Sequence, residues 1–260
     1  MMPLHFHRSG SGEPLFILHG LFGTWENLGT TIKTLAEHYD VIAPDMLNHG
    51  RSPHIETFNY ETMANAVLEL ADQLNIETFK LLGHSMGGKI AMELAINHPD
   101  RIEKLIVVDI APVQYPHHHV DVFEGLKSIS LETLKSRSEA DKHLATHVSN
   151  PSVRAFLLKN LYRNKAGRFE WRMHLSALDT HYQHIAAAVS KGRYSGPTLF
   201  IKGSDSEYLL ADYQHAVTQR FANTQLRIIE GTGHWPHAEK PALFTKIVER
   251  FLSDSSNRAG

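Results

Sequence analysis

The stretch Gly83-His84-Ser85-Met86-Gly87 stands between two segments of different periodicity. Before it, residues 79–82 (FKLL) form a short apolar run typical of a buried strand. After it, residues 86–97 (MGGKIAMELAIN) repeat apolar side chains at helical spacing. A glycine-flanked serine between a strand and a helix is the arrangement of a nucleophile elbow, in which the hydroxyl stands above the sheet beside helix N-terminal amides. We therefore predict that Ser85 is a nucleophile; the alternative is an ordinary glycine-rich loop.

Strand-like and helix-like segments alternate along much of the chain. Most strand-like segments are nearly continuous apolar runs, which is typical of strands buried on both faces of a parallel sheet. The alternation predicts an α/β fold with helices on both faces, in which ligands bind beyond the carboxyl ends of the strands. The expected strands are residues 15–18, 41–43, 79–82, 105–108, 198–201 and 226–229, and the expected helices are residues 25–37, 60–74, 86–97 and 208–221.

A long stretch between Asp109 and Thr198 breaks this alternation. A loop of that length without secondary structure is improbable in a compact domain. We therefore expect a core made of residues 1–111 and 196–260, and a helical cap of residues 112–195 that covers the predicted nucleophile. The expected cap helices are residues 122–126, 131–144, 152–161 and 172–190.

The composition excludes several classes of protein. Of the 260 residues, 42% are hydrophobic and 21% are charged, and the net charge of −2 favours neither nucleic acid nor an anionic membrane. No apolar run approaches the ~20 residues of a membrane span, and the first ten residues lack the apolar core of a secretory signal. The absence of cysteine excludes thiolate catalysis and cysteine–zinc sites. We expect a cytoplasmic protein without nucleic-acid or membrane partners, needing no cofactor, and present as a monomer or homodimer.

The chain contains 19 histidines, and the run His117-His118-His119 suggests a metal site. Adjacent side chains point in different directions on any regular backbone, so three consecutive histidines do not easily converge on one ion. We interpret the run as a solvated loop and expect no metal there.

A serine nucleophile needs a base that is oriented by a third group. With this type of elbow the partners follow in the order serine, acid, histidine. His234 lies in residues 231–235 (GTGHW), directly after an expected strand, and is the expected base. His237 is its main competitor, but its position past Pro236 suggests that it faces the start of the last helix.

Two aspartates compete for the role of the acid. Asp109 ends the strand that follows the elbow helix, and Asp205 lies in the loop after the 198–201 strand. Proteins with this motif often place the acid three residues after the glycine of that loop, where this chain has Ser206, so Asp205 stands one residue early. We favour Asp109, with Ser206 adding a hydrogen bond to the histidine–aspartate pair, and keep Asp205 as the alternative.

Stabilising a developing oxyanion requires two backbone N–H groups aimed at the place where the charge forms. One should belong to Met86, which follows the serine. The other should come from the loop after an early strand, and residues 19–23 (HGLFG) fit this requirement. We expect Leu21 to be the donor, with Phe22 as the alternative.

A further polar loop, residues 45–52 (DMLNHGRS), follows the 41–43 strand. Asp45 has no elbow around it, so it is not a second nucleophile. We expect Asp45 and Asn48 to bind local backbone amides.

Together, HGLFG, PDMLNHGRS, GHSMGGK, VVDIAPVQY and GTGHWPHAEKP resemble the α/β-hydrolase superfamily, and more closely the bacterial YbfF-type esterases and their eukaryotic abhydrolase relatives. The resemblance covers nearly all of the chain apart from the middle of the cap. It implies a mostly parallel eight-stranded core with a helical cap, and Asp109 as the acid with Ser206 nearby. The sequence departs from relatives by placing Asp205 where they often have asparagine.

The resemblance also implies serine esterase or thioesterase activity on short acyl esters through an acyl-enzyme on Ser85, with acyl-CoA thioesters as proposed substrates. We expect Phe22, His84 and Trp235 to contact the substrate. A basic cluster in the cap could meet the phosphates of CoA, although a solvated helical face is the alternative. Its candidate members are Arg154, Lys159 and Arg163.

Other functions with a serine elbow stay open. A cofactor-free C–C bond hydrolase or a haloperoxidase-like enzyme would carry the same motifs. A catalytically inactive hydrolase fold that acts as a ligand receptor is the alternative outside the enzymes.

Overall fold

The computed structural model describes residues 3–254. Within that range the main sheet has seven strands in the order β1-β3-β2-β4-β5-β8-β9. β1 runs antiparallel to β3, and the other neighbouring strands are parallel, so the predicted α/β class with a mostly parallel sheet is confirmed. The strands are β1 (Phe6–Ser9), β2 (Glu13–Leu18), β3 (Tyr39–Pro44), β4 (Phe79–His84), β5 (Ile102–Val108), β8 (Tyr194–Gly203) and β9 (Phe221–Ile229).

The expected count of eight strands is wrong for the described residues. The sheet ends at β1, and no further described segment pairs with that edge. The sequence does not predict β1 itself, because its residues (FHRS) are mostly polar and none of them is fully buried. An edge strand of this kind lacks the continuous apolar run that identifies the central strands.

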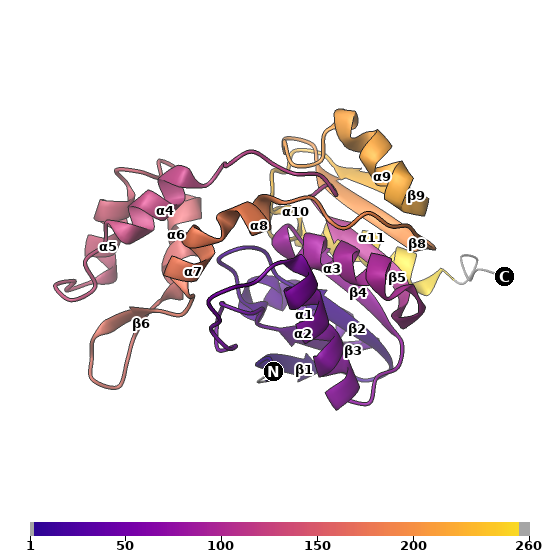
Figure 1. Ribbon diagram of the computed structural model, residues 1–260, viewed down its shortest axis with the longest axis horizontal. Helices are drawn as coiled ribbons and strands as arrows, with labels where there is room; N and C mark the ends of the chain where they lie inside the picture. Colours follow the sequence, from indigo (N-terminus) through magenta and orange to yellow (C-terminus); the bar gives the residue numbers. More distant parts are fainter. Residues whose placement is uncertain (1–2, 255–260) are drawn as a thin grey trace.

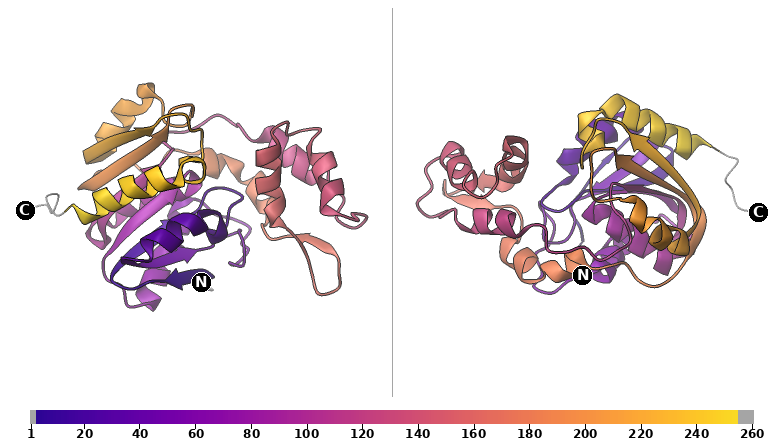
Figure 2. Two further views of the ribbon diagram at one scale, coloured as in Figure 1. Left: turned by 180° about the vertical axis from the view of Figure 1, so that it is seen from behind. Right: turned by 90° about the horizontal axis from the view of Figure 1, so that it is seen from above.

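Alternate side chains of each strand pack on opposite faces of the sheet. Phe16 and Leu18 of β2 belong to the apolar cluster that includes α2 and α3, whereas Leu15 and Ile17 belong to the cluster that includes α1 and α11. Figures 1 and 2 show helices on both faces of the sheet. The core helices are α1 (Gly29–Leu35), α2 (Tyr60–Gln73), α3 (Met86–Asn97), α9 (Gln214–Arg220), α10 (Pro236–Glu239) and α11 (Pro241–Ser253), with 3₁₀ turns η1 (Trp25–Leu28), η2 (Pro99–Arg101) and η4 (Ala211–Tyr213).

Two expected helices are shorter than predicted. The helix expected over 25–37 divides into η1 and α1, and the one expected over 208–221 begins only at Gln214, after η4. Tertiary contacts hold the chain at the start of the expected helix, since Ser206 donates to Asp109 at the end of the neighbouring strand β5 and the Tyr208 carbonyl accepts from the Tyr115 hydroxyl. Tertiary contacts at the site therefore override the local helical pattern.

The cap extends away from the carboxyl-end side of the sheet (Figure 1). β8 starts at Tyr194, so the first two residues of that strand lie inside the expected cap boundary. The cap contains α4 (Val120–Lys127), α5 (Arg137–Leu144), α6 (Pro151–Leu157), the 3₁₀ turn η3 (Leu158–Asn160), the strands β6 (Leu161–Arg163) and β7 (Phe169–Trp171), α7 (Leu175–Thr180) and α8 (Tyr182–Ala186).

The cap contains helices as expected, but it is not entirely helical, because β6 and β7 form an antiparallel hairpin. Asn164 turns the chain between them, since its side-chain oxygen accepts from the amides of Ala166 and Arg168. Gly167 then adopts a φ of +78°, a conformation that glycine reaches at little cost. The helix expected over 131–144 is also shorter, because α5 begins at Arg137.

A buried lysine joins the core to both chain segments that enter and leave the cap. Lys89 of α3 is 1% exposed, and its Nζ donates to the carbonyls of Val113 and Ala187. Burial lowers the pKa of this lysine to about 7. The ammonium group also lies near the rings of Tyr60 and Tyr115. Because Val113 precedes α4 and Ala187 follows α8, one side chain holds both ends of the cap.

Candidate active site

Ser85 occupies the turn between β4 and α3, with φ and ψ of +55° and −118°. A non-glycine residue at positive φ is costly, and such residues cluster at active sites where the surroundings fix them. The flanking glycines are required sterically. A Cβ on Gly83 would lie 2.1 Å from the carbonyl oxygen of Gly87, and a Cβ on Gly87 would lie 2.4 Å from that of Leu18. The sequence therefore specifies this sharp turn.

The structure brings Ser85, His234 and Asp109 into one hydrogen-bonded series. Ser85 Oγ lies 2.9 Å from His234 Nε2, and His234 Nδ1 lies 2.7 Å from Asp109 Oδ2. His234 comes from the loop between β9 and α10, and Asp109 directly follows β5. Asp109 is 0% exposed, and its carboxylate also accepts from the Gly203 amide at 3.1 Å and from the Ser206 hydroxyl. These donors replace water around the buried charge.

The two competing residues lie outside this series. Asp205 is exposed, and its carboxylate accepts from the hydroxyl of its neighbour Ser204 at 2.7 Å. His237 is buried with its ring 4.5 Å from that of His84 and 5.9 Å from that of Phe244 in α11, so it packs against the last helix. Burial lowers the pKa of His237 to about 3.

His84 lines the cavity, but its polar contact is with the His234 loop. Its Nε2 lies 2.7 Å from the backbone carbonyl of His234, and because a carbonyl only accepts, the imidazole donates at this nitrogen. Burial lowers the pKa of His84 well below its usual value, so the ring is neutral at neutral pH. The residue that precedes the nucleophile therefore holds the loop that carries the histidine.

Two further buried histidines stabilise the loop over residues 19–23 through hydrogen bonds with backbone amides. The sequence analysis did not predict this role for either of them. His19 Nε2 accepts from the Met46 amide at 2.9 Å, and His49 Nε2 accepts from the Phe22 amide at 3.1 Å. Burial lowers the pKa of both, that of His49 to about 3, so both accept as neutral imidazoles. The signal in the sequence is that each precedes a glycine in an HG pair, within HGLFG and NHGRS.

The Phe22 peptide is fixed on both sides, which removes it as an oxyanion donor. Its N–H is occupied by His49, and its carbonyl accepts from Asn160 Nδ2 of the cap at 2.7 Å. The alternative donor Phe22 is therefore wrong. Leu21, the preceding residue, remains the expected donor from this loop. Met86 is the first residue of α3, and an amide at that position has no acceptor within the helix.

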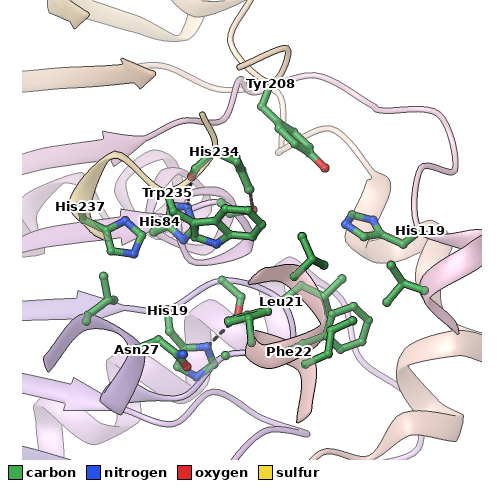
Figure 3. Close-up of a pocket in the computed structure, with 18 residues that line it drawn as sticks. His19, Leu21, Phe22, Asn27, His84, His119, Tyr208, His234, Trp235 and His237 are labelled. Carbon is green, nitrogen blue, oxygen red and sulfur yellow. Dashed lines mark hydrogen bonds between the residues drawn. The ribbon is translucent and has the colours of Figure 1, made fainter. Parts of the chain in front are cut away.

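A cavity of about 150 Å³ opens beside Ser85 between the core loops and the cap (Figure 3). Phe22, His84 and Trp235, which we expected at the substrate, all lie in its wall. No lysine, arginine, aspartate or glutamate is among the described residues that line it. The apolar part of the wall is formed by Leu21, Phe22, Leu28, Val122, Val153, Phe156, Leu157 and Trp235.

The basic residues expected to meet CoA phosphates do not line this cavity. Arg154 pairs with Asp141 at 2.9 Å and also donates to backbone carbonyls of the cap. Arg163 donates to the carbonyls of Gly167 and Lys135. Lys159 is exposed on η3. The two arginines therefore stabilise the cap itself, a use that their spacing in the sequence does not reveal.

The histidine run is only partly the solvated loop that we expected. His117 and His118 are exposed, but His119 is half-buried and lines the cavity. Its ring turns inward because Nδ1 lies 2.6 Å from the hydroxyl of the buried Tyr182. Among the residues that the structure describes, no group of three or more histidine or carboxylate side chains has metal-binding geometry.

Asp45 and Asn48 bind local groups as expected. The Asp45 carboxylate accepts from the amides of Trp25 and Arg51, and Asn48 Oδ1 accepts from the Ile55 amide. These bonds fix the loop that carries His49, and so they support the Phe22 peptide indirectly.

The arrangement of a serine turn, a histidine loop and a buried aspartate at the strand ends of a mostly parallel sheet defines a class of hydrolase. A model of the α/β-hydrolase fold family matches residues 13–241, and the chain belongs to this family. Within residues 3–254, no helix is long and apolar enough to cross a membrane.

Three similar proteins are named as esterases or lipases. The chain is 34% identical to the esterase YbfF of Escherichia coli over 94% of each chain. It is 37% identical to the sn-1-specific diacylglycerol lipase ABHD11 of Mus musculus, covering 92% of this chain and 80% of that one. A solved marine microorganism esterase superposes with a TM-score of 0.94 at 35% identity, covering 96% of this chain and 100% of that one. The protein is therefore a serine hydrolase with ester-hydrolysing activity.

Proposed function

We propose that this protein cleaves carboxylic esters through an acyl-enzyme on Ser85, with His234 as the base and Asp109 as the acid that orients it. The observation that carries the proposal is the unbroken series from Ser85 Oγ to His234 (2.9 Å) and from His234 to Asp109 (2.7 Å). Because the carboxylate accepts from Nδ1, a neutral imidazole carries its proton there and leaves Nε2 able to accept the serine proton.

In the first half of the reaction, Ser85 Oγ attacks the acyl carbon while its proton passes to His234 Nε2. The tetrahedral intermediate collapses, the bond to the alcohol breaks, and the alcohol leaves with the proton from His234. In the second half, water gives a proton to His234 and attacks the acyl-enzyme, which releases the carboxylic acid and restores the serine hydroxyl. The amides of Leu21 and Met86 would hold the oxyanion in both halves.

Ser206 is a supporting residue in this scheme. Its hydroxyl donates to Asp109 Oδ2, the same oxygen that faces His234 Nδ1. This second donor helps to hold the buried carboxylate in place beside the imidazole.

The cavity supports small acyl esters as the substrate class. Its volume of about 150 Å³ is that of a protein cavity that binds a single benzene ring, so one group of about six carbons fits. The same steps would cleave a thioester, with a thiol leaving in place of the alcohol. However, the described residues that line the cavity include no lysine or arginine, so its contacts favour a simple ester over a nucleotide-bearing thioester such as acyl-CoA.

The test is reaction of the folded protein with a fluorophosphonate probe, followed by peptide mass spectrometry and by hydrolysis of ethyl butyrate in a pH-stat. We expect one adduct, on Ser85, and loss of both labelling and hydrolysis in Ser85→Ala. Hydrolysis that survives in Ser85→Ala would exclude the serine mechanism. Folded protein without an adduct would favour the ligand receptor, and turnover of a vinylogous diketone but not of esters would favour the C–C bond hydrolase.

A further inference from the structure

Among the polar side chains of the cavity wall that the proposed reaction does not use are His119 of the cap and Tyr208 of the loop after β8. Figure 3 shows both reaching into the cavity from neighbouring positions, with the Tyr208 hydroxyl pointing toward His119. The Tyr208 ring is fixed because it stacks on His234 with ring centres 4.0 Å apart. Most of the surrounding wall is apolar, so a polar atom that entered here would depend on these two groups.

The hydrogen bond to Tyr182 sets the tautomer of His119. Burial raises the pKa of Tyr182, so its hydroxyl keeps its proton. This hydroxyl proton is available to His119 Nδ1, which lies 2.6 Å from the Tyr182 oxygen. Because Nδ1 accepts, the ring proton of a neutral His119 lies on Nε2.

The environment of His119 is uncharged. Burial lowers the pKa of His119 to about 4, so the ring is neutral at neutral pH. The described lining residues include no acid and no lysine or arginine. A carboxylate in such a place would lose its hydration without gaining a cation, whereas a neutral oxygen needs only a hydrogen-bond donor.

We propose that His119 Nε2 and Tyr208 Oη form a recognition point for a neutral hydroxyl or carbonyl oxygen that the substrate carries outside its scissile ester group. Among the described residues, neither His119 Nε2 nor Tyr208 Oη forms a hydrogen bond with the rest of the protein. A substrate carbonyl would accept from both groups, and a substrate hydroxyl would accept from His119 and donate to Tyr208. This inference rests on the proposed function, since it names the class of ester that the Ser85 site prefers.

The experiment compares esters that differ by one hydroxyl group, with ethyl butyrate as the common reference substrate. Ethyl 3-hydroxybutyrate places the additional oxygen in the acyl part, and 2-hydroxyethyl butyrate places it in the alcohol part. We expect the wild-type protein to hydrolyse at least one hydroxylated ester with a kcat/KM about tenfold above that of ethyl butyrate. The ester that shows the preference identifies the part of the substrate that faces His119.

For variants of the recognition point, the readout is the ratio of kcat/KM for the preferred hydroxylated ester to kcat/KM for ethyl butyrate. A general loss of folded enzyme lowers both values equally and leaves this ratio unchanged. His119→Phe should bring the ratio close to one, and Tyr208→Phe should lower it in part. His119→Gln should restore much of it, since an amide N–H reaches a position similar to Nε2. Tyr182→Phe should also lower it, because His119 then no longer has to carry its proton on Nε2. The matched control is His118→Phe, an exposed neighbour that should keep the wild-type ratio.

Two results would overturn the recognition point. One is a wild-type protein that prefers neither hydroxylated ester to ethyl butyrate. The other is a preference that persists unchanged in His119→Phe. Both are distinct from failure of the proposed function, which would appear as ethyl butyrate hydrolysis that survives in Ser85→Ala.

Discussion

The carboxyl ends of the core strands and the cap contribute to the site in different ways. The core supplies Ser85 and Asp109 from positions of positive φ, with values of +55° and +54°, and Phe22, beside the expected oxyanion donor Leu21, has a φ of +61°. Each such non-glycine residue costs roughly 1–3 kcal/mol and persists only when the surroundings determine its conformation. Here the surroundings are a parallel sheet buried on both faces, which makes the strand ends rigid.

The cap contributes shape and polarity. Val122, Val153 and Phe156 extend half-buried side chains from short helices into the cavity wall. No described cap residue joins the Ser85–His234–Asp109 series. The cap contacts the core through a few polar side chains, among them Lys89 and Asn160. The difference suggests that the chemistry depends on the sheet and that substrate choice depends on the cap, and the following predictions test this division.

The largest effect should come from the acid in the core. Asp109→Asn should lower kcat about 10⁴-fold, because asparagine no longer holds the histidine in the required tautomer. Asp205→Asn, the matched change in the neighbouring loop, should alter kcat by about twofold or less, as is usual for an exposed residue. The measurement is ester hydrolysis under saturating substrate. A loss of turnover only in Asp205→Asn would reverse the assignment of the acid.

The second prediction concerns the attachment of the cap. Lys89→Met should lower the free energy of unfolding by about 3 kcal/mol, since the partly buried carbonyls of Val113 and Ala187 lose their donor. It should also make the cap more sensitive to limited proteolysis than the core. Urea unfolding measures the first effect, and the exposed Lys33→Met is the control. If cap cleavage were unchanged, the lysine would not hold the cap ends.

A third, smaller effect concerns the free energy of unfolding at acidic pH. We expect the buried histidines of the core to make it depend on pH. The pKa of His237 is about 3 in the folded protein and near 6.5 in the unfolded chain. The unfolded chain therefore binds the proton first, and stability is lost as the pH falls from 6.5 toward 3. The free energy of unfolding of the wild-type protein should therefore fall between pH 7 and pH 5, and in His237→Phe this fall should be smaller by about 2 kcal/mol.

The measurement is urea unfolding at both pH values. His143→Gln in the cap is the control, because this histidine is exposed and should leave the pH dependence unchanged. An identical pH dependence in His237→Phe and the wild-type protein would contradict the prediction.

The smallest effect should come from the hydrogen bond that Asn160 of the cap donates to the loop over residues 19–23. Asn160→Leu removes the donor to the Phe22 carbonyl and should lower kcat about tenfold with little change in KM, less than the 10²–10³ expected for removing an oxyanion donor itself. Asn150→Ala, which removes the N-terminal cap of α6, is the control for general loosening of the cap. Equal losses in both variants would show that Asn160 acts only through cap stability.

The central strands and the serine turn were predictable because their causes are local. Buried parallel strands require continuous apolar runs, and the turn at Ser85 requires glycine on both sides, so both leave a clear pattern in the sequence. The edge strand β1 and the hairpin of β6 and β7 were missed, because short strands of mixed polarity resemble loops or helix ends. The count of eight strands came from the resemblance and does not hold for the described residues.

The sequence by itself determined the α/β class, the elbow at Ser85 and the short set of residues that could join it. Only the tertiary structure distinguished Asp109 from Asp205, occupied the Phe22 amide with His49, and turned His119 into the cavity. The reason is physical. The periodicity of apolar residues and the spacing of glycines are properties of residues close together in the sequence. A hydrogen bond between side chains 125 positions apart instead depends on which strand ends lie side by side.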